Sequence, residues 1–311
     1  MPQTPLGAAP PRQSGSRAES HLQSGNHGDT APEFEPLSVA GQNPASQQEG
    51  GQETMTQETI LETKNLTKEF KGFTAVSDVN LRVRRGSIHA LIGPNGAGKT
   101  TCFNLLTKFL EPTTGTILFN GIDITREKPA QIARRGVIRS FQISAVFPHL
   151  TVRENVRIGL QRQLGTAFQF WRSERSLDVL NGRAMELLDQ VGLTEYAETV
   201  TVNLPYGRKR ALEIATTLAM EPELMLLDEP TQGMGHEDVD RVTQLIKKVS
   251  AGRTILMVEH NMSVVSSIAD KITVLQRGAI LAEGPYAEVS KDPRVMEAYM
   301  GTADAELQGA H

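Results

Sequence analysis

The residues best suited to chemistry form a glycine-rich loop at positions 93–100. They match the G-x-x-x-x-G-K-[ST] pattern of phosphate-binding loops and are Gly93, Pro94, Asn95, Gly96, Ala97, Gly98, Lys99 and Thr100. The glycines let several backbone N–H groups point inward at phosphate, and the following helix N-terminus adds partial positive charge. We expect Lys99 to reach the outer phosphates, Thr100 to ligate Mg²⁺ and Thr101 to donate to an inner phosphate. The loop predicts a nucleoside triphosphate site without specifying the reaction.

A pair of acids forms the second candidate group. Asp228 and Glu229 follow an apolar run at residues 224–227, which is typical of a buried strand. At the end of that strand, Asp228 is placed to hold the magnesium shell and Glu229 to act as general base on the attacking water. The alternative is a strand that simply ends at two solvated acids. Because the same chain also contains a phosphate loop, the catalytic interpretation of the pair is favoured.

The elements that must position these residues alternate between strand and helix patterns. Strands are predicted at residues 59–61, 76–83, 87–92, 116–119, 223–227 and 254–258, with a closing hairpin at 272–275 and 280–282. Helices are predicted at residues 101–110 and 238–249, and the apolar spacing is helical between 151 and 218 except at Pro205. This alternation predicts an α/β fold with a mostly parallel sheet.

Composition limits the class of protein. The chain has 311 residues, 39% of them apolar, and a net charge of −4, so it lacks the electrostatic footprint of a nucleic-acid-binding protein. Cys102 is the only cysteine, which excludes a disulfide framework and a cysteine-based zinc site. No apolar run approaches the roughly 18 residues of a membrane helix, and the N-terminus does not look like a signal peptide. We therefore expect any membrane role to depend on a partner.

The two ends of the chain differ from the patterned region. Residues 1–55 are rich in Pro, Gly, Ser and Gln, and we expect them to form a disordered tail. A short C-terminal tail is expected at residues 304–311. Two alternatives stay open for the N-terminal tail: it docks on a partner, or translation begins at Met55.

From about residue 58 to residue 301 the chain resembles the ATPases of ABC transporters. Gln142 resembles the family's Q-loop glutamine. This resemblance implies that Gln142 senses the metal and contacts the membrane partner. His260 resembles the switch histidine that contacts the γ-phosphate. Phe70 lies where the family has an aromatic ring that stacks on adenine, and Phe73 is a competing candidate.

The signature motif departs from the family pattern. Where the family has Leu-Ser-Gly-Gly-Gln, this chain has Leu-Pro-Tyr-Gly-Arg at residues 204–208, so only Leu204 and Gly207 match. Pro205 lacks the serine hydroxyl that reaches ATP in the opposite subunit, although Gly207 and the next helix can still present N–H groups. Gly235 replaces the aspartate usual after the catalytic carboxylate. Cross-dimer coupling through that aspartate is therefore in question.

These departures resemble one branch of the family. The Tyr-Gly of the signature, the Gly233-Met234 pair and the segment 292–301 are similar to ATPases of branched-chain amino acid importers. Importers of urea or short amides share these features. The transported solute itself is selected by other subunits.

The resemblance implies an ABC ATPase domain at residues 56–303. It implies a RecA-like phosphate-loop core, an N-terminal antiparallel β subdomain and a helical insert at about 144–218. Two such domains, either two copies or two paralogues, are expected to close head to tail around ATP and Mg²⁺. Implied partners are transmembrane permease subunits and, indirectly, a periplasmic solute-binding protein, at the cytoplasmic face of the inner membrane.

Rival functions fit less well. A soluble ABC-type ATPase of DNA repair needs a long coiled coil, and ribosome-acting members usually carry two phosphate loops in one chain. A low-activity regulatory subunit is favoured by Pro205 and Gly235 but opposed by Glu229 and His260. A GTPase is disfavoured because no guanine-reading Asn-Lys-x-Asp run is present, and a small-molecule kinase because the sequence offers no obvious acceptor site.

Overall fold

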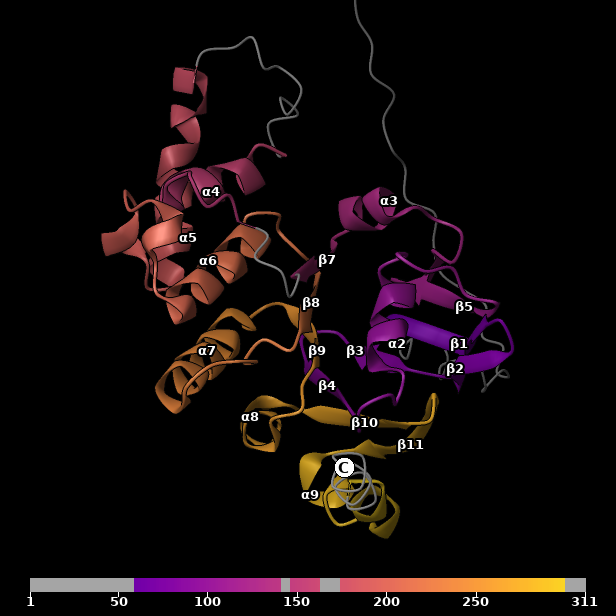
Figure 1. Ribbon diagram of the computed structural model, residues 1–311. Coiled ribbons are helices and arrows are strands. Elements are labelled where there is room, and N and C mark those ends of the chain that lie inside the picture. The colour runs from indigo at the N-terminus through magenta and orange to yellow at the C-terminus, as the bar shows by residue number, and fades with distance from the viewer. Residues whose placement is uncertain (1–58, 141–145, 163–173, 300–311) are drawn as a thin grey trace, which may run out of the picture. The chain divides into compact units, whose positions relative to one another are not determined.

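A six-stranded sheet forms the centre of the fold, and five of its strands run parallel (Figure 1). The computed structural model describes residues 59–140, 146–162 and 174–299, all within one unit that spans residues 48–311. The strand order is β11-β10-β4-β9-β8-β7, and only β11 is antiparallel to its neighbour. The strands are β4 (Ile88–Ile92), β7 (Val137–Ser140), β8 (Leu224–Asp228), β9 (Thr254–Val258), β10 (Lys271–Gln276) and β11 (Ala279–Gly284). The α/β fold with a mostly parallel sheet is confirmed.

Side chains on both faces of this sheet are buried. Leu224 and Leu226 of β8 pack into one apolar core, whereas Met225 and Leu227 pack into another. Successive strand residues point to opposite faces, so a continuous apolar run is what a sheet covered on both sides requires. The apolar residues of β8 and β9 therefore place the carboxyl ends of these strands, and the polar residues after them, at one edge.

The first core lies beneath an antiparallel sheet. Its central strand β1 (Thr59–Phe70) pairs with β2 (Phe73–Val79), β3 (Arg82–Arg84) and β5 (Thr114–Phe119), and β5 pairs with β6 (Ile122–Asp123). Helix α2 (Lys99–Leu106) packs into the same core through Cys102 and Phe103. The N-terminal antiparallel β region is thereby confirmed.

The second core lies beneath a helical layer. Helices α7 (His236–Val249) and α8 (Met262–Ile268) contribute to it, as do α4 (Val152–Leu160), α5 (Asn181–Gln190) and α6 (Tyr206–Leu218) of the predicted insert. Short 3₁₀ segments at Glu174–Leu180, Thr194–Tyr196 and Thr201–Asn203 connect the insert helices. Thr151 begins α4 with a capping box, accepting from the Glu154 N–H while Glu154 accepts from the Thr151 N–H.

Two local predictions need correction, and several elements were missed. The single strand predicted at 76–83 is wrong, because Asp78 takes a φ of 49° and the strand is interrupted at residues 80–81, between β2 and β3. The helix predicted at 101–110 is α2, which begins two residues earlier and ends at Leu106 before Lys108 takes a φ of 60°. Strand β7 and helices α3 (Pro129–Arg134), α8 and α9 (Tyr286–Val289) were not predicted.

Among the described helices, none has the length and apolar character needed to cross a bilayer.

Candidate nucleotide-binding site

The phosphate loop joins β4 to α2 and is held open by glycines. Gly93, Gly96 and Gly98 have φ values of 150°, 75° and 100°. Residues other than glycine rarely adopt these positive φ values. A Cβ on Gly93 would lie 2.2 Å from the Leu275 carbonyl oxygen, and one on Gly98 would lie 2.5 Å from that of Ala75. The loop is therefore fixed against neighbouring backbone, and α2 begins at Lys99 with its N-terminus toward the loop.

Because of this close approach, Gly93→Ala is expected to destabilise the loop. The control is Gly72→Ala, since Gly72 has a φ of 89° but its Cβ would meet no atom within 4 Å. Both variants carry the cost of a positive φ, whereas only the first must also displace the β10 backbone. We expect Gly93→Ala to lose about 1–3 kcal/mol more unfolding free energy than Gly72→Ala in urea titrations, and to bind ATP more weakly. Equal losses and equal ATP affinities would contradict this account of the loop.

Lys99 is held within the loop by its own backbone. Its Nζ donates to the carbonyl oxygens of Gly93 at 2.7 Å and Pro94 at 3.0 Å, and the side chain is nearly buried. Burial lowers the pKa of the Lys99 ammonium, while the nearby charges of Glu229 and Asp228 act in the opposite direction. The predicted cation therefore lies between the loop and the two acids.

Glu229 shares a cavity with the phosphate loop. This cavity of about 330 Å³ is lined by Glu229, Phe73, Ala75 and loop and helix residues, namely Asn95, Gly96, Ala97, Gly98, Lys99, Thr100 and Thr101. Glu229 itself has a φ of 46°, a strained conformation for this residue type, and its N–H donates to the Val258 carbonyl at 2.9 Å. The backbone turn after β8 separates the two acids, as their catalytic interpretation requires.

Asp228 is buried beside a cation that the sequence did not single out. One oxygen, Oδ2, accepts from Arg139 on β7, whose other terminal nitrogen donates to Asn104 at 2.6 Å. The other oxygen, Oδ1, is buried without a hydrogen-bond partner among the described residues. Carboxylate oxygen, threonine hydroxyl and phosphate are ligands that Mg²⁺ prefers. Asp228 and the exposed Thr100 therefore fit the predicted metal.

His260 and the two aromatic candidates are all exposed. His260 is exposed and follows β9, whose Val258 is in register with Asp228 of β8. Phe70 and Phe73 face each other across the β1–β2 hairpin, and both are exposed. Only Phe73 lines the cavity, whereas the Phe70 ring lies 5.1 Å from the Lys68 ammonium. This geometry favours Phe73 over Phe70 as the adenine platform, and both remain predictions.

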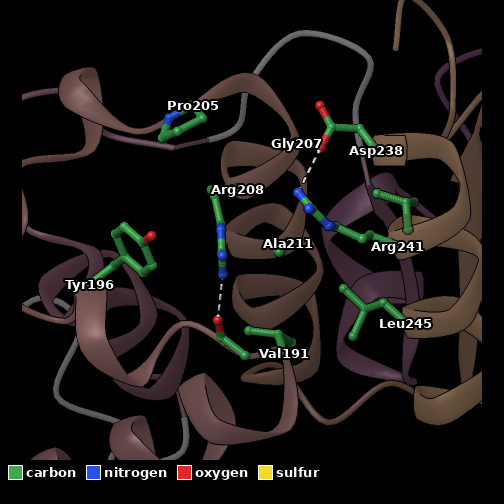
Figure 2. A pocket seen from close by; sticks show the side chains of 11 residues that line it. Val191, Tyr196, Pro205, Gly207, Arg208, Ala211, Asp238, Arg241 and Leu245 are labelled. Atoms are coloured by element: carbon green, nitrogen blue, oxygen red, sulfur yellow. Dashed lines mark hydrogen bonds and ion pairs between the residues drawn. The ribbon is translucent and has the colours of Figure 1, made fainter. Parts of the chain in front are cut away.

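The signature residues lie at a different cavity (Figure 2). Pro205 is the N-cap of α6, Leu204 is buried, and a Cβ on Gly207 would lie 2.5 Å from the Asp238 carboxylate. Arg208 stands where the family has glutamine, so the sequence predicts an added charge at this helix N-terminus. Instead it donates to the Gly192 carbonyl at 2.9 Å, with its guanidinium 4.7 Å from the centre of the Tyr196 ring.

The described residues thus bring together the phosphate loop, Asp228 and Glu229. Gly207 lines a cavity that shares no residue with the loop cavity, and Leu204 is buried in the second core. Gln142 lies outside the described residues, so its roles in catalysis and metal binding remain predictions.

Sequence reasoning missed three charged residues around the acids. Arg139 pairs with Asp228. Arg210 of α6 donates to the carbonyl oxygens of Asp228 and Pro230 at 3.2 and 3.1 Å. Glu259 accepts hydrogen bonds from the segment after Glu229. One sequence signal could have identified these residues: each lies next to or within a buried apolar run. A charged side chain in such a place needs a partner, because burying an unpaired charge is costly.

Comparison with known proteins agrees with this geometry. The family model described as ABC transporter matches residues 76–232, and the model described as branched-chain amino acid ATP-binding cassette transporter matches residues 279–305. The high-affinity branched-chain amino acid transport ATP-binding protein BraF of Pseudomonas aeruginosa is 40% identical over 258 residues, covering 78% of this chain and 98% of BraF. LivG of Escherichia coli K12, with the same description, is 39% identical over 255 residues, again covering 78% of this chain and 98% of LivG.

Solved structures show the same fold. The ADP conformation of an ATP-binding cassette of an ABC transporter matches with a TM-score of 0.69 and 30% identity, covering 78% of this chain and 99% of that one. A dimeric post-hydrolysis cassette bound to ADP and Pi matches with a TM-score of 0.61 and 26% identity, covering 73% and 98%. The chain therefore belongs to the ABC transporter family, in its branch of branched-chain amino acid ATP-binding cassettes.

Proposed function

We propose that this chain hydrolyses ATP to drive the import of branched-chain amino acids. The observation that carries the proposal is the cavity in which Glu229 faces a complete phosphate loop. The match of residues 279–305 to the branched-chain amino acid model and the names of BraF and LivG support the class of solute.

The residues of the cavity divide the chemistry between them. The loop N–H groups and Lys99 bind the phosphates, and Glu229 accepts a proton from the attacking water. Asp228 and Thr100 would hold Mg²⁺, which offsets charge on the transferred phosphoryl group when bound. Arg139 binds Oδ2 of Asp228, so Oδ1, which has no hydrogen-bond partner among the described residues, is the oxygen that would ligate the metal.

The separation of the two cavities supports a site completed by a second ATPase subunit. Gly207 and the α6 N-terminus lie at a cavity distinct from the chain's own phosphate loop, so they are available to a nucleotide held by another subunit. The solved dimeric cassette shows that a related chain adopts a paired state. ATP then favours closure, because only the closed pair makes both sets of contacts.

A two-subunit site predicts weak hydrolysis by the purified chain alone. Association must offset lost translational and rotational freedom, and here it rests only on contacts made through ATP. We expect the specific ATPase activity to rise with protein concentration and the chain to elute as a monomer without nucleotide. Rapid hydrolysis that is independent of protein concentration would contradict the two-subunit site.

A partly apolar cavity at the end of β7 supports docking of a permease. The cavity of about 160 Å³ is lined by residues of β7, α4 and α6, among them Ser140, Ile158 and Thr216, and by the half-exposed Phe147. In the sequence, Ser140 stands two residues before the predicted Q-loop glutamine, Gln142. We propose that permease subunits bind here, which places the chain at the cytoplasmic face of the inner membrane. A periplasmic solute-binding protein would act through those permeases.

The class of solute can be tested in cells. Deletion of the gene is expected to abolish high-affinity uptake of labelled leucine, isoleucine and valine, while urea and acetamide uptake stays unchanged. Expression of the parental chain should restore uptake, and expression of Glu229→Gln should not. Loss of urea or amide uptake with normal leucine uptake would reject the proposed solute in favour of the related importers.

A further inference from the structure

Glu259 is a fully buried carboxylate at the end of β9. Its Oε1 accepts from the backbone N–H of Thr231 at 3.1 Å and from the Thr231 hydroxyl at 2.5 Å. Its Oε2 accepts from the backbone N–H groups of His260 at 2.9 Å and Asn261 at 3.0 Å. One side chain therefore joins two loops that follow neighbouring strands.

These two loops carry proposed catalytic groups. Thr231 stands two residues after Glu229 in the loop that follows β8. On the other side, Asn261 caps α8 by accepting from the Ser263 N–H at 3.1 Å, so the position of His260 is fixed from both directions. The bond from the Glu229 N–H to the Val258 carbonyl is a second link, which ties the start of the first loop to the last residue of β9. A displacement of one loop is thus transmitted to the other.

The chemistry of the linkage requires a carboxylate. Both oxygens act as acceptors, and the three backbone partners can only donate. A glutamine of the same shape has one acceptor and one donor end, so its NH₂ group would face N–H donors on one side. Leaving a buried donor without an acceptor is costly, which would release either the Thr231 loop or the His260 loop.

We propose that Glu259 is a positioning residue that holds the general base and the switch histidine in register. Its side chain is fully buried and is bonded to Thr231, His260 and Asn261, so it acts through the two loops. The inference rests on the proposed roles of Glu229 and His260. It implies that hydrolysis depends on Glu259 whereas nucleotide binding by the phosphate loop does not.

The full-length chain carrying Glu259→Gln tests this at a protein concentration where parental hydrolysis is measurable. We expect kcat to fall at least tenfold, with less than a twofold change in KM for ATP and in Kd for ADP. Thr231→Val, which lacks the hydroxyl donor, should lower kcat in the same selective way, whereas Thr231→Ser should keep the parental kcat. The Glu259→Gln, Thr231→Val double variant should lose no more than the larger single loss, because both act through one contact.

Several outcomes would overturn the inference. These are a parental kcat in Glu259→Gln, a loss of ADP affinity that matches the fall in kcat, or losses that multiply in the double variant. If Glu259→Gln does not fold, the Thr231→Val and Thr231→Ser pair decides the question alone. Glu229→Gln and His260→Ala are assayed in parallel. If both keep parental turnover, the proposed catalytic roles fail; if both lose it and Glu259→Gln does not, only the positioning role fails.

Discussion

Glu229→Gln is expected to slow ATP hydrolysis by about 10²- to 10⁴-fold, the usual contribution of a general base. The substitution preserves shape and leaves the strained backbone at φ 46° and its bond to Val258 in place. Lys99 and Asp228 are untouched, so ATP and magnesium should still bind. The variant should therefore accumulate as an ATP-bound closed dimer, visible by gel filtration in ATP and absent in ADP.

Glu237→Gln is the matched control for this variant. Glu237 lies in the first turn of α7 and is highly exposed, so the same loss of charge there should leave turnover within twofold of the parent. Parental turnover in Glu229→Gln would assign the base to another group, with His260 as the next candidate.

Lys99→Ala is expected to abolish ATP-dependent transport. It removes the one cation of the phosphate loop, which now bonds the Gly93 and Pro94 carbonyls and which would pair with phosphate when nucleotide enters. Hydrogen bonds to charged groups contribute about 1.5–3 kcal/mol, so the Kd for ATP should rise roughly tenfold to hundredfold. Hydrolysis should fall further, because the same ammonium offsets charge that develops in the transition state.

Titration of the full chain with a fluorescent ATP analogue measures the binding loss, and phosphate release measures turnover. Lys247→Ala, at an exposed position in the last turn of α7, is the control for loss of positive charge. Tight ATP binding with normal turnover in Lys99→Ala would defeat the assignment of the phosphate loop.

The sequence was most informative where chemistry is encoded by neighbouring residues. The phosphate loop is one continuous run of residues, and Asp228 and Glu229 are neighbours in the sequence. The apolar strands before each of them have the pattern of a parallel sheet covered on both faces. Local residue types were therefore sufficient to predict the core and its ligand class. The insert helices followed from apolar spacing in the same way.

What could not be predicted depends on pairing between distant segments. Arg139 and Asp228 are 89 residues apart, and Thr231 and Glu259 are 28 apart, so neither contact leaves a local pattern. Strand β7 is only four residues long and includes the charged Arg139, which hides its apolar character. The choice between Phe70 and Phe73 likewise depended on the register of the β1–β2 hairpin.

The direction of Arg208 was also beyond local reasoning. Its position suggested a charge near the N-terminus of α6, but the side chain instead bonds the Gly192 carbonyl and stacks on Tyr196. Tyr206 remains exposed, with its hydroxyl donating to the Gln232 carbonyl at 3.3 Å. We therefore expect the signature of this chain to present backbone N–H groups and Tyr206, rather than an arginine charge, to the proposed second subunit.

The most direct test of the account is transport by the assembled complex. This chain and its permease and partner ATPase subunits would be reconstituted in liposomes, with the solute-binding protein and labelled leucine on one side and ATP on the other. We predict leucine accumulation that requires ATP, scales with phosphate release, and disappears when Glu229→Gln replaces the parental chain. Leucine accumulation that continues at the parental rate with Glu229→Gln, or without this chain, would contradict the claim that its ATP hydrolysis drives import.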